Sequence, residues 1–198
     1  MRHSAASPAG NAGADVTGSP TGEEALVIPA IADDGSLFPI GKLDAHRRGQ
    51  RHLAISVFVF AGDQLLIQKR AAGKYHCGGL WANTCCTHPH WGESPADCAR
   101  RRLFEEIGLV LELQPRAVVD YQADVGNGLI ENERVHVFRG DVAAPFDVSG
   151  FNHEEVEDVA WVDQQTLRQQ ALQNPDHFTP WIRIYLERWN ELALRPAA

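Results

Sequence analysis

The pattern of apolar and polar positions predicts strands alternating with helices from about residue 24 onward. Residues 53–60 are almost all apolar, which is typical of a strand covered on both faces. A Gly-Asp turn follows, so residues 64–70 are expected to form its hairpin partner. Further strands are predicted at residues 25–31, 117–123, 134–139 and 159–162, with a tight turn at 33–36.

One helix has well-marked ends and spans residues 95–107. Ser94 suits the N-cap, Pro95 suits the first helical position, and Gly108 suits the C-terminal end. Residues 163–172 and 180–194 also have helical periodicity. Mixed strands with helices before and after them predict an α/β fold, with the sheet sandwiched between helices.

The first 22 residues contain almost no large apolar side chains. Such a segment buries too little surface to offset its ordering entropy, so residues 1–22 are predicted to be a disordered tail. The remaining residues, 23–198, are enough for one domain and too few for two. No stretch approaches the roughly 18 apolar residues of a membrane span, so no membrane association is expected.

The net charge of −8 argues against a nucleic-acid partner, which normally requires a basic surface. The basic residues are nevertheless grouped, at residues 47–51, 69–74 and 100–102. These groups would suit a small anion such as a phosphate, and a solvated surface is the alternative.

The four cysteines are predicted to be free thiols. No secretory apolar segment precedes them, and a bridge between the adjacent Cys85 and Cys86 would be strained. The spacings also lack the paired C-x-x-C units of a structural zinc site. Free thiols indicate a reducing compartment, so the protein is expected in the cytoplasm.

Five groups could form a metal site. Glu131 and Glu133 lie two apart at the start of a predicted strand, so their carboxylates share a face and repel unless a cation lies between them. His46, His52 and His88 supply imidazoles, and these ligand types suit a divalent transition metal. An exposed acidic edge with unrelated histidines remains the alternative.

On the predicted helix, Arg102 and Glu106 lie four residues apart and therefore on one face. They could form an ordinary helix-stabilising ion pair. Alternatively, Glu106 could hold Mg²⁺ while Arg102 binds a phosphate, because Mg²⁺ often takes one or two carboxylates plus phosphate oxygens, and arginine binds phosphate bidentately.

This region resembles a Nudix box, Gly-x5-Glu-x7-Arg-Glu-U-x-Glu-Glu-x-Gly-U, where U is apolar. The matching positions are Glu93, Arg101, Leu103, Glu105, Glu106, Gly108 and Leu109. Thr87 stands in place of the first glycine, and Arg102 replaces the first glutamate of the metal-binding trio. A cation in place of a metal ligand argues against a pyrophosphohydrolase.

Two further motifs flank the box. Trp-x-Asn-Thr-Cys-Cys-x-His-Pro precedes it and Glu-Asn-Glu follows it, and with them residues 24–194 resemble the type I isopentenyl-diphosphate isomerases. The resemblance implies a Nudix fold and interconversion of isopentenyl and dimethylallyl diphosphate, in isoprenoid biosynthesis, through a carbocation. Two departures are visible: the segment from His46 to His52 is one residue shorter than in the family, and residues 76–79 replace a Pro-Gly turn.

The resemblance also assigns residues. The implied catalytic residues are Cys86, Glu133, Tyr121 and Trp181. The implied ligands of a transition metal, Mn²⁺ or Zn²⁺, are His46, His52, His88, Glu131 and Glu133. Glu106 would hold Mg²⁺ together with the substrate diphosphate. Lys42, Arg70, Lys74 and Arg102 would lie near that diphosphate.

The expected partner is therefore a small isoprenoid diphosphate, with no nucleic acid and no membrane, and the protein would be a monomer or weak homodimer. A Nudix hydrolase of nucleoside or other diphosphates is the second hypothesis. A non-catalytic metal-binding or redox-sensing module, with Cys85 and Cys86 as its switch, is the third.

Overall fold

The computed structural model describes residues 26–195. The predicted tail, residues 1–22, lies outside this range, so the boundary near residue 23 stays a prediction. In chain order the elements are β1 (Val27–Ile31), β2 (Leu37–Gly41), α1 (Lys42–Arg48), β3 (His52–Ala61), β4 (Gln64–Arg70), β5 (Trp81–Ala82), β6 (Cys85–Thr87), α2 (Pro95–Ile107), β7 (Gln114–Asp124), β8 (Ile130–Val142), β9 (Val156–Asp163), α3 (Gln164–Gln173), the 3₁₀ helix η2 (Pro175–His177), α4 (Pro180–Glu187) and the 3₁₀ helix η3 (Trp189–Leu192).

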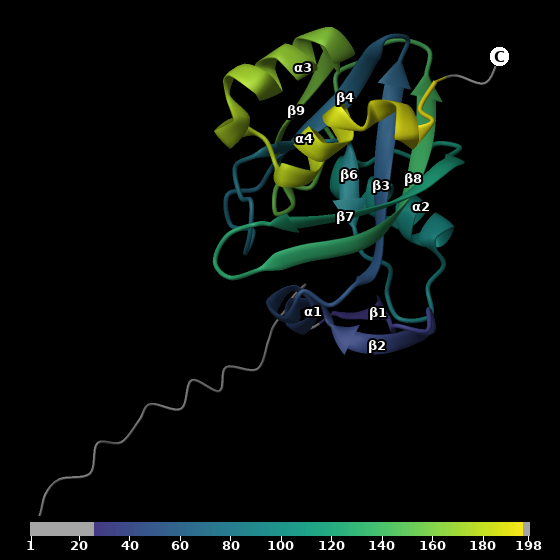
Figure 1. The fold of residues 1–198 in the computed structure, drawn as a ribbon. Coiled ribbons are helices and arrows are strands. Elements are labelled where there is room, and N and C mark those ends of the chain that lie inside the picture. Colours follow the sequence, from purple (N-terminus) through teal and green to yellow (C-terminus); the bar gives the residue numbers. More distant parts are fainter. Residues whose placement is uncertain (1–25, 196–198) are drawn as a thin grey trace, which may run out of the picture.

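The strand β3 lies at the centre of a mixed sheet (Figure 1). It pairs in parallel with β8 and antiparallel with β6, and its ends contact β1 and β4. Every residue of β3 is buried, as its continuous apolar pattern predicts. The hairpin of β1 and β2 lies with α1 at one end of the molecule (Figure 1).

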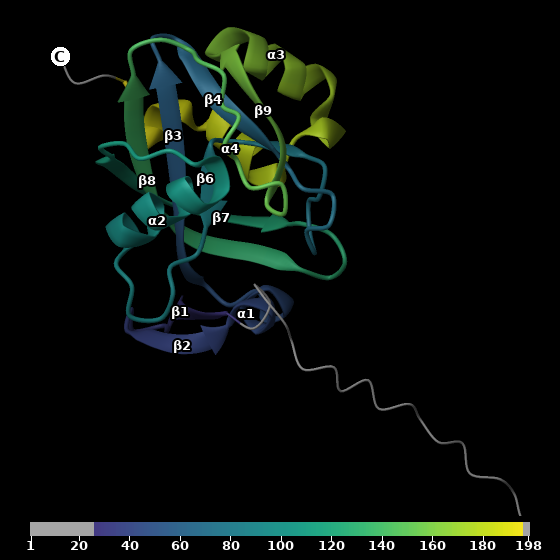
Figure 2. The ribbon, with the colours of Figure 1, turned by 180° about the vertical axis from the view of Figure 1, so that it is seen from behind.

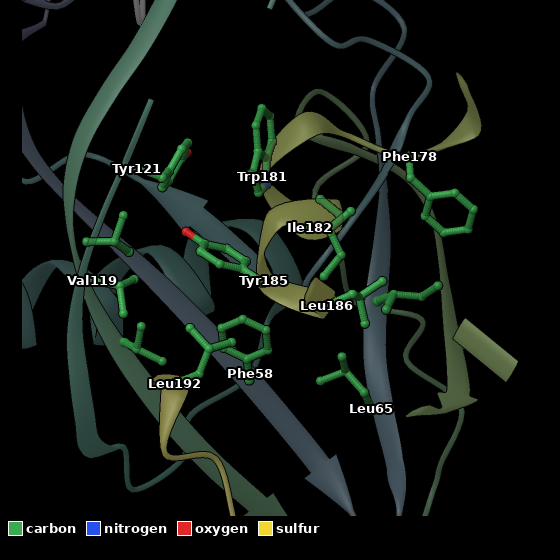
Figure 3. Packing of buried hydrophobic residues seen from close by; sticks show 14 of the residues in the cluster. Phe58, Leu65, Val119, Tyr121, Phe178, Trp181, Ile182, Tyr185, Leu186 and Leu192 are labelled. Carbon is green, nitrogen blue, oxygen red and sulfur yellow. The ribbon is translucent and has the colours of Figure 1, made fainter. Parts of the chain in front are cut away.

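Helices cover both faces of the sheet. On one face α3 and α4 lie in front of the strands, and on the other face lies α2 (Figures 1 and 2). Phe58 of β3 packs with Ile182 and Tyr185 of α4 in one core (Figure 3), whereas Val57 packs with Leu103 of α2 in the other. The predicted α/β/α arrangement is confirmed.

The boundaries of α2 agree with the prediction from its capping residues. The Ser94 hydroxyl accepts a hydrogen bond from the backbone N–H of Asp97 at 3.1 Å. At the other end, Gly108 has a φ of 76°, and its N–H donates to the carbonyl of Phe104 at 2.8 Å. The terminal signals therefore fix the position of this helix in the sequence.

Several short elements were not predicted. They are β2, α1, and the strands β5 and β6, which lie between residues 70 and 95, where no element was predicted. In addition, α4 ends at Glu187 and a 3₁₀ helix follows, whereas the periodicity predicts a helix to residue 194. Among residues 26–195, no helix is both long enough and apolar enough to cross a bilayer.

The glycine that ends α2 generates a stability prediction. A Cβ at Gly108 would lie 2.8 Å from the carbonyl oxygen of Gly150, whereas Gly126, with a similar positive φ of 84°, has open space around it. Gly126→Ala should cost about 1–2 kcal/mol from backbone strain alone, and Gly108→Ala at least about 1 kcal/mol more because of the overlap. Urea unfolding of both variants measures the difference; equal losses would contradict the close approach.

Candidate active site

One pocket gathers most of the predicted site residues. Its walls come from α1, the loop after β4, the strands β6, β7 and β8, the loop before β9, and the helices α2 and α4. The predicted residues that line it are Lys42, Arg70, Lys74, Cys86, His88, Arg102, Glu106, Tyr121, Glu131, Glu133 and Trp181. His46 and His52 are fully buried against the carboxylates of this pocket.

Strand pairing places the reactive side chains. Glu133 on β8 lies opposite His52 on β3 and opposite Tyr121 on β7. The antiparallel pairing of β6 with β3 places Cys86 beside Ser56. Side chains from four strands thus meet because each strand is held in register with a neighbour.

The predicted metal ligands converge within the protein. The ligand atoms of His46, His52, His88 and Glu131 all lie within 4.8 Å of one another. The Nε2 atoms of His52 and His88 are 3.1 Å apart, and His46 Nε2 lies 3.1 Å from Oε2 of Glu131. Glu133 extends the cluster, with its Oε1 2.8 Å from Nε2 of His88.

The histidines of this cluster turn their Nε2 atoms inward. His46 Nδ1 donates to the carbonyl of Lys42 at 2.6 Å, and His52 Nδ1 donates to that of Gln50 at 2.7 Å. In the neutral rings, Nε2 therefore carries a lone pair facing other lone pairs. Two ligands about 2.1 Å from one metal lie roughly 3.0–3.4 Å apart, so this donor set fits a divalent transition metal.

The pKa of His46 reflects the negative charge of the neighbouring Glu131. Burial would lower this pKa, but the hydrogen bond and negative charge of Glu131 outweigh it, and the pKa is raised. A proton therefore competes with a metal ion for His46, so metal affinity should fall as the pH falls.

The adjacent thiols face different surroundings. Cys85 is fully buried in the core beneath α2, whereas Cys86 packs at the edge of the other core and lines the pocket. The Cys86 thiol donates to Oδ1 of Asn83 at 2.7 Å. Burial raises the pKa of Cys86 to about 12, so the thiol keeps its proton at neutral pH. The two side chains thus point to opposite sides, as neighbours in a strand do.

Glu133 shares this pocket with Cys86 and carries a negative charge. Burial would raise the pKa of Glu133, but His52 and Tyr121 stabilise its carboxylate and the net pKa is lowered. Burial raises the pKa of Tyr121 well above its usual value, so this hydroxyl keeps its proton. The pocket therefore contains a proton donor, Cys86, and a carboxylate, Glu133.

Trp181 forms an apolar wall of the pocket at the start of α4. Thr179 caps this helix and Pro180 occupies its first position, which fixes where the indole emerges. The ring is 3% exposed, and the guanidinium of Arg70 lies 5.3 Å from its centre. A buried indole with one face toward a cation can stabilise positive charge.

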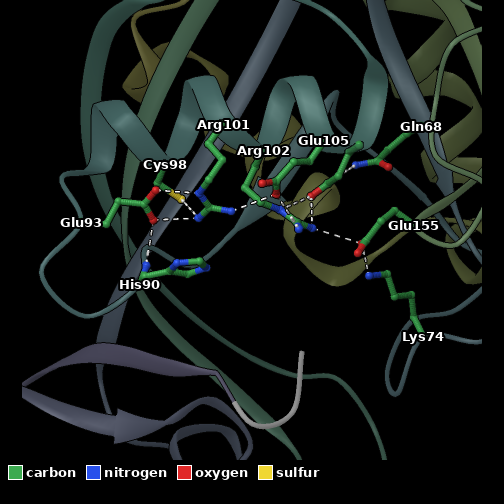
Figure 4. A network of polar contacts seen from close by, with 10 residues as sticks. Gln68, Lys74, His90, Glu93, Cys98, Arg101, Arg102, Glu105 and Glu155 are labelled. Atoms are coloured by element: carbon green, nitrogen blue, oxygen red, sulfur yellow. Dashed lines mark hydrogen bonds and ion pairs between the residues drawn. The ribbon is translucent and has the colours of Figure 1, made fainter. Parts of the chain in front are cut away.

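At the α2 side of the pocket, basic and acidic side chains form one network (Figure 4). Arg102 Nη2 lies 2.7 Å from Glu106 Oε1 and 3.1 Å from Glu155 Oε2, and Lys74 also pairs with Glu155. Gln68 donates to the other oxygen of Glu106 at 2.9 Å. The helix ion pair between Arg102 and Glu106 is therefore formed, while their roles toward Mg²⁺ and phosphate stay predictions.

His76, Thr87 and Glu155 also line the pocket, and Gln68 contacts Glu106 beside it, but none of these four was predicted as a site residue. Gln68 is a polar position in a strand, and Glu155 belongs to an acidic loop without periodicity. His76 carried a signal, because it opens the four residues that depart from the family's Pro-Gly turn.

Comparison with known proteins agrees with this geometry. A family model described as a NUDIX domain matches residues 50–182. The crystal structure of DR0079 from Deinococcus radiodurans superposes with a TM-score of 0.66 over 82% of this chain and 98% of that one, at 13% identity, which shows the shared fold. Fold and match together define a NUDIX domain.

Comparison with curated proteins identifies a narrower family within the NUDIX domains. The isopentenyl-diphosphate Delta-isomerase of Dinoroseobacter shibae is 55% identical over 166 residues, 83% of this chain and 93% of the relative. That of Cereibacter sphaeroides is 55% identical over 163 residues, 81% of this chain and 90% of the relative. The chain therefore belongs to the isopentenyl-diphosphate Delta-isomerase family of NUDIX proteins.

The cluster generates a prediction about metal content. Purified protein should retain about one transition-metal ion per chain yet still need added Mg²⁺ for turnover. His88→Ala should remove most of the bound metal, whereas His136→Ala, on the opposite face of β8, should leave it unchanged. Elemental analysis after dialysis gives the result. Active protein without a transition metal, or full activity without Mg²⁺, would contradict the two sites.

Proposed function

We propose that this protein interconverts isopentenyl diphosphate and dimethylallyl diphosphate, with Cys86 and Glu133 as its acid–base pair. The assignment of these two residues rests on one observation. The protonated thiol of Cys86 and the carboxylate of Glu133 face the same pocket, which also has an indole wall and basic residues.

The reaction adds a proton to one carbon and removes a proton from another. An alkene is a very weak base, so the donor must be held close to it in a pocket that excludes water. Cys86 and Glu133 exchange the acid and base roles when the direction reverses. Tyr121, opposite Glu133 on β7, relays the proton.

Between the two proton transfers the substrate carries positive charge on a tertiary carbon. The face of Trp181 stabilises that charge, an interaction of about 2 kcal/mol or more in a desolvated site. No hydrogen-bonding partner of the indole N–H is present among the described residues, so packing and not a hydrogen bond positions the ring.

The basic residues of the pocket bind the diphosphate. Arg70, Lys74 and Lys42 line the pocket. Arg102 is paired with Glu155 and Glu106, and on substrate binding its guanidinium contacts phosphate oxygens in place of one of these carboxylates. Glu106 would hold Mg²⁺, which would supply positive charge against the diphosphate. Binding energy from this remote end orients the reacting carbons.

The five predicted His and Glu ligands would hold the transition metal, Mn²⁺ or Zn²⁺, whose positive charge would keep Glu133 as a carboxylate. We place the protein in the cytoplasm as a monomer or weak homodimer. With a net charge of −8, we expect a small-molecule substrate and no nucleic acid.

Isotope incorporation tests the reaction. With isopentenyl diphosphate and Mg²⁺ in D₂O, dimethylallyl diphosphate carrying deuterium should appear, because the added proton comes from exchangeable groups. The control is the same incubation with Cys86→Ala. Release of inorganic phosphate without dimethylallyl diphosphate would instead identify a hydrolase.

The adjacent thiols supply a matched pair of variants. Loss of a proton-transfer group typically costs about 10²–10⁴-fold in rate, so Cys86→Ala should lose at least that much kcat. Cys85→Ala should keep most activity, because a buried thiol behaves as a small apolar side chain and its loss affects stability. Measurements of kcat, metal content and thermal midpoint separate these effects. An inactive Cys85→Ala enzyme, or two active variants, would overturn the assignment of Cys86.

A further inference from the structure

A fourth histidine lies at the metal cluster. His76 Nε2 is 3.3 Å from Oε1 of Glu131, whereas Oε2 of the same carboxylate faces His46 at 3.1 Å and His52 at 3.8 Å. The two oxygens of Glu131 therefore have separate partners, with Oε2 directed at the cluster and Oε1 at His76. His76 is not one of the four residues whose ligand atoms lie within 4.8 Å of one another.

The loop that carries His76 is held in an unusual conformation. Cys77 has a φ of 52°, and a Cβ at Gly78 would lie 2.5 Å from the carbonyl oxygen of Ala72. Arg70 donates to the carbonyl of His76 at 3.4 Å. These constraints direct the imidazole inward, where it is only 5% exposed.

Aromatic rings hold the imidazole from two sides. Tyr75 meets it edge to face at a centroid distance of 4.4 Å, and Trp181 does so at 5.9 Å. Within residues 26–195, Nδ1 of His76 has no hydrogen-bond partner, so Glu131 provides the polar contact of the ring. A carboxylate oxygen offers only lone pairs, so a proton on Nε2 would make this contact attractive.

We propose that His76 is a positioning residue that holds Oε1 of Glu131 and thereby keeps Oε2 aimed at the transition metal. The inference rests on the metal site of the proposed function. Groups that orient metal ligands in this way typically contribute 10–100-fold to metal affinity.

Metal affinity without substrate tests this role. Zn²⁺ affinity is measured by competition with a chelator for the wild-type protein, His76→Leu, His76→Gln and the control His136→Leu. Leucine fills similar space without a donor, whereas the glutamine amide retains an N–H. We expect His76→Leu to bind Zn²⁺ about 10–100-fold more weakly, at unchanged stoichiometry. His76→Gln should recover much of that loss, and the control should match the wild type.

Activity provides a second measurement. The metal concentration for half-maximal isomerase activity should rise in His76→Leu by the same factor as the dissociation constant, while the rate at saturating metal changes much less. A merely structural role would lower stability without this shift, and the thermal midpoint of each variant is compared for that purpose.

Two results would overturn the proposal: wild-type affinity in His76→Leu, or equal losses in the leucine and glutamine variants. Wild-type protein that binds no Zn²⁺ would overturn the site and this role together. Wild-type protein that binds Zn²⁺ but does not isomerise the substrate would contradict the proposed reaction and leave the role of His76 standing.

Discussion

The parallel pairing of β3 with β8 is the constraint on which the site depends. It places His52 beside Glu133, and the period of two along β8 puts Glu131 on the same face. A slip of one residue would turn both carboxylates to the other face of the sheet. The apolar β3, buried along its whole length, prevents such a slip because every shifted position would have to repack.

This register places two carboxylates in the interior, and their negative charge determines which groups can lie next to them. Glu131 and Glu133 are both almost completely buried, where an unpaired charge is costly. The imidazoles that face them are oriented by backbone carbonyls, so the cluster offers lone pairs to a cation. Burial and metal binding are therefore linked, because two buried carboxylates are tolerated only where positive charge lies near them.

The sequence predicted the elements whose signals are local or strictly periodic. The apolar run of β3 and the caps Ser94 and Gly108 of α2 had such signals, and the spacing of Glu131 and Glu133 predicted their shared face. The short helix α1 had no apolar period, although it carries His46. The positions of His76 and Glu155 depend on loops whose course is set by contacts distant in sequence; only the departure from the family's Pro-Gly turn pointed to His76, and nothing pointed to Glu155. Family resemblance, and not periodicity, pointed to Trp181.

In the proposed reaction, the hydrocarbon and the diphosphate of the substrate contact different walls of the pocket. Toward α4, Cys86, Glu133 and Trp181 surround the space for the hydrocarbon, while α2 supplies charged groups at the other wall. At Arg102 a guanidinium stands where the Nudix box has a carboxylate, which changes the local charge from −1 to +1. Under the proposed function, that arginine would bind the diphosphate directly, and the box would have one fewer carboxylate for the metals of a hydrolase. We therefore expect this site to bind an intact diphosphate while proton transfer proceeds at the far end of the substrate.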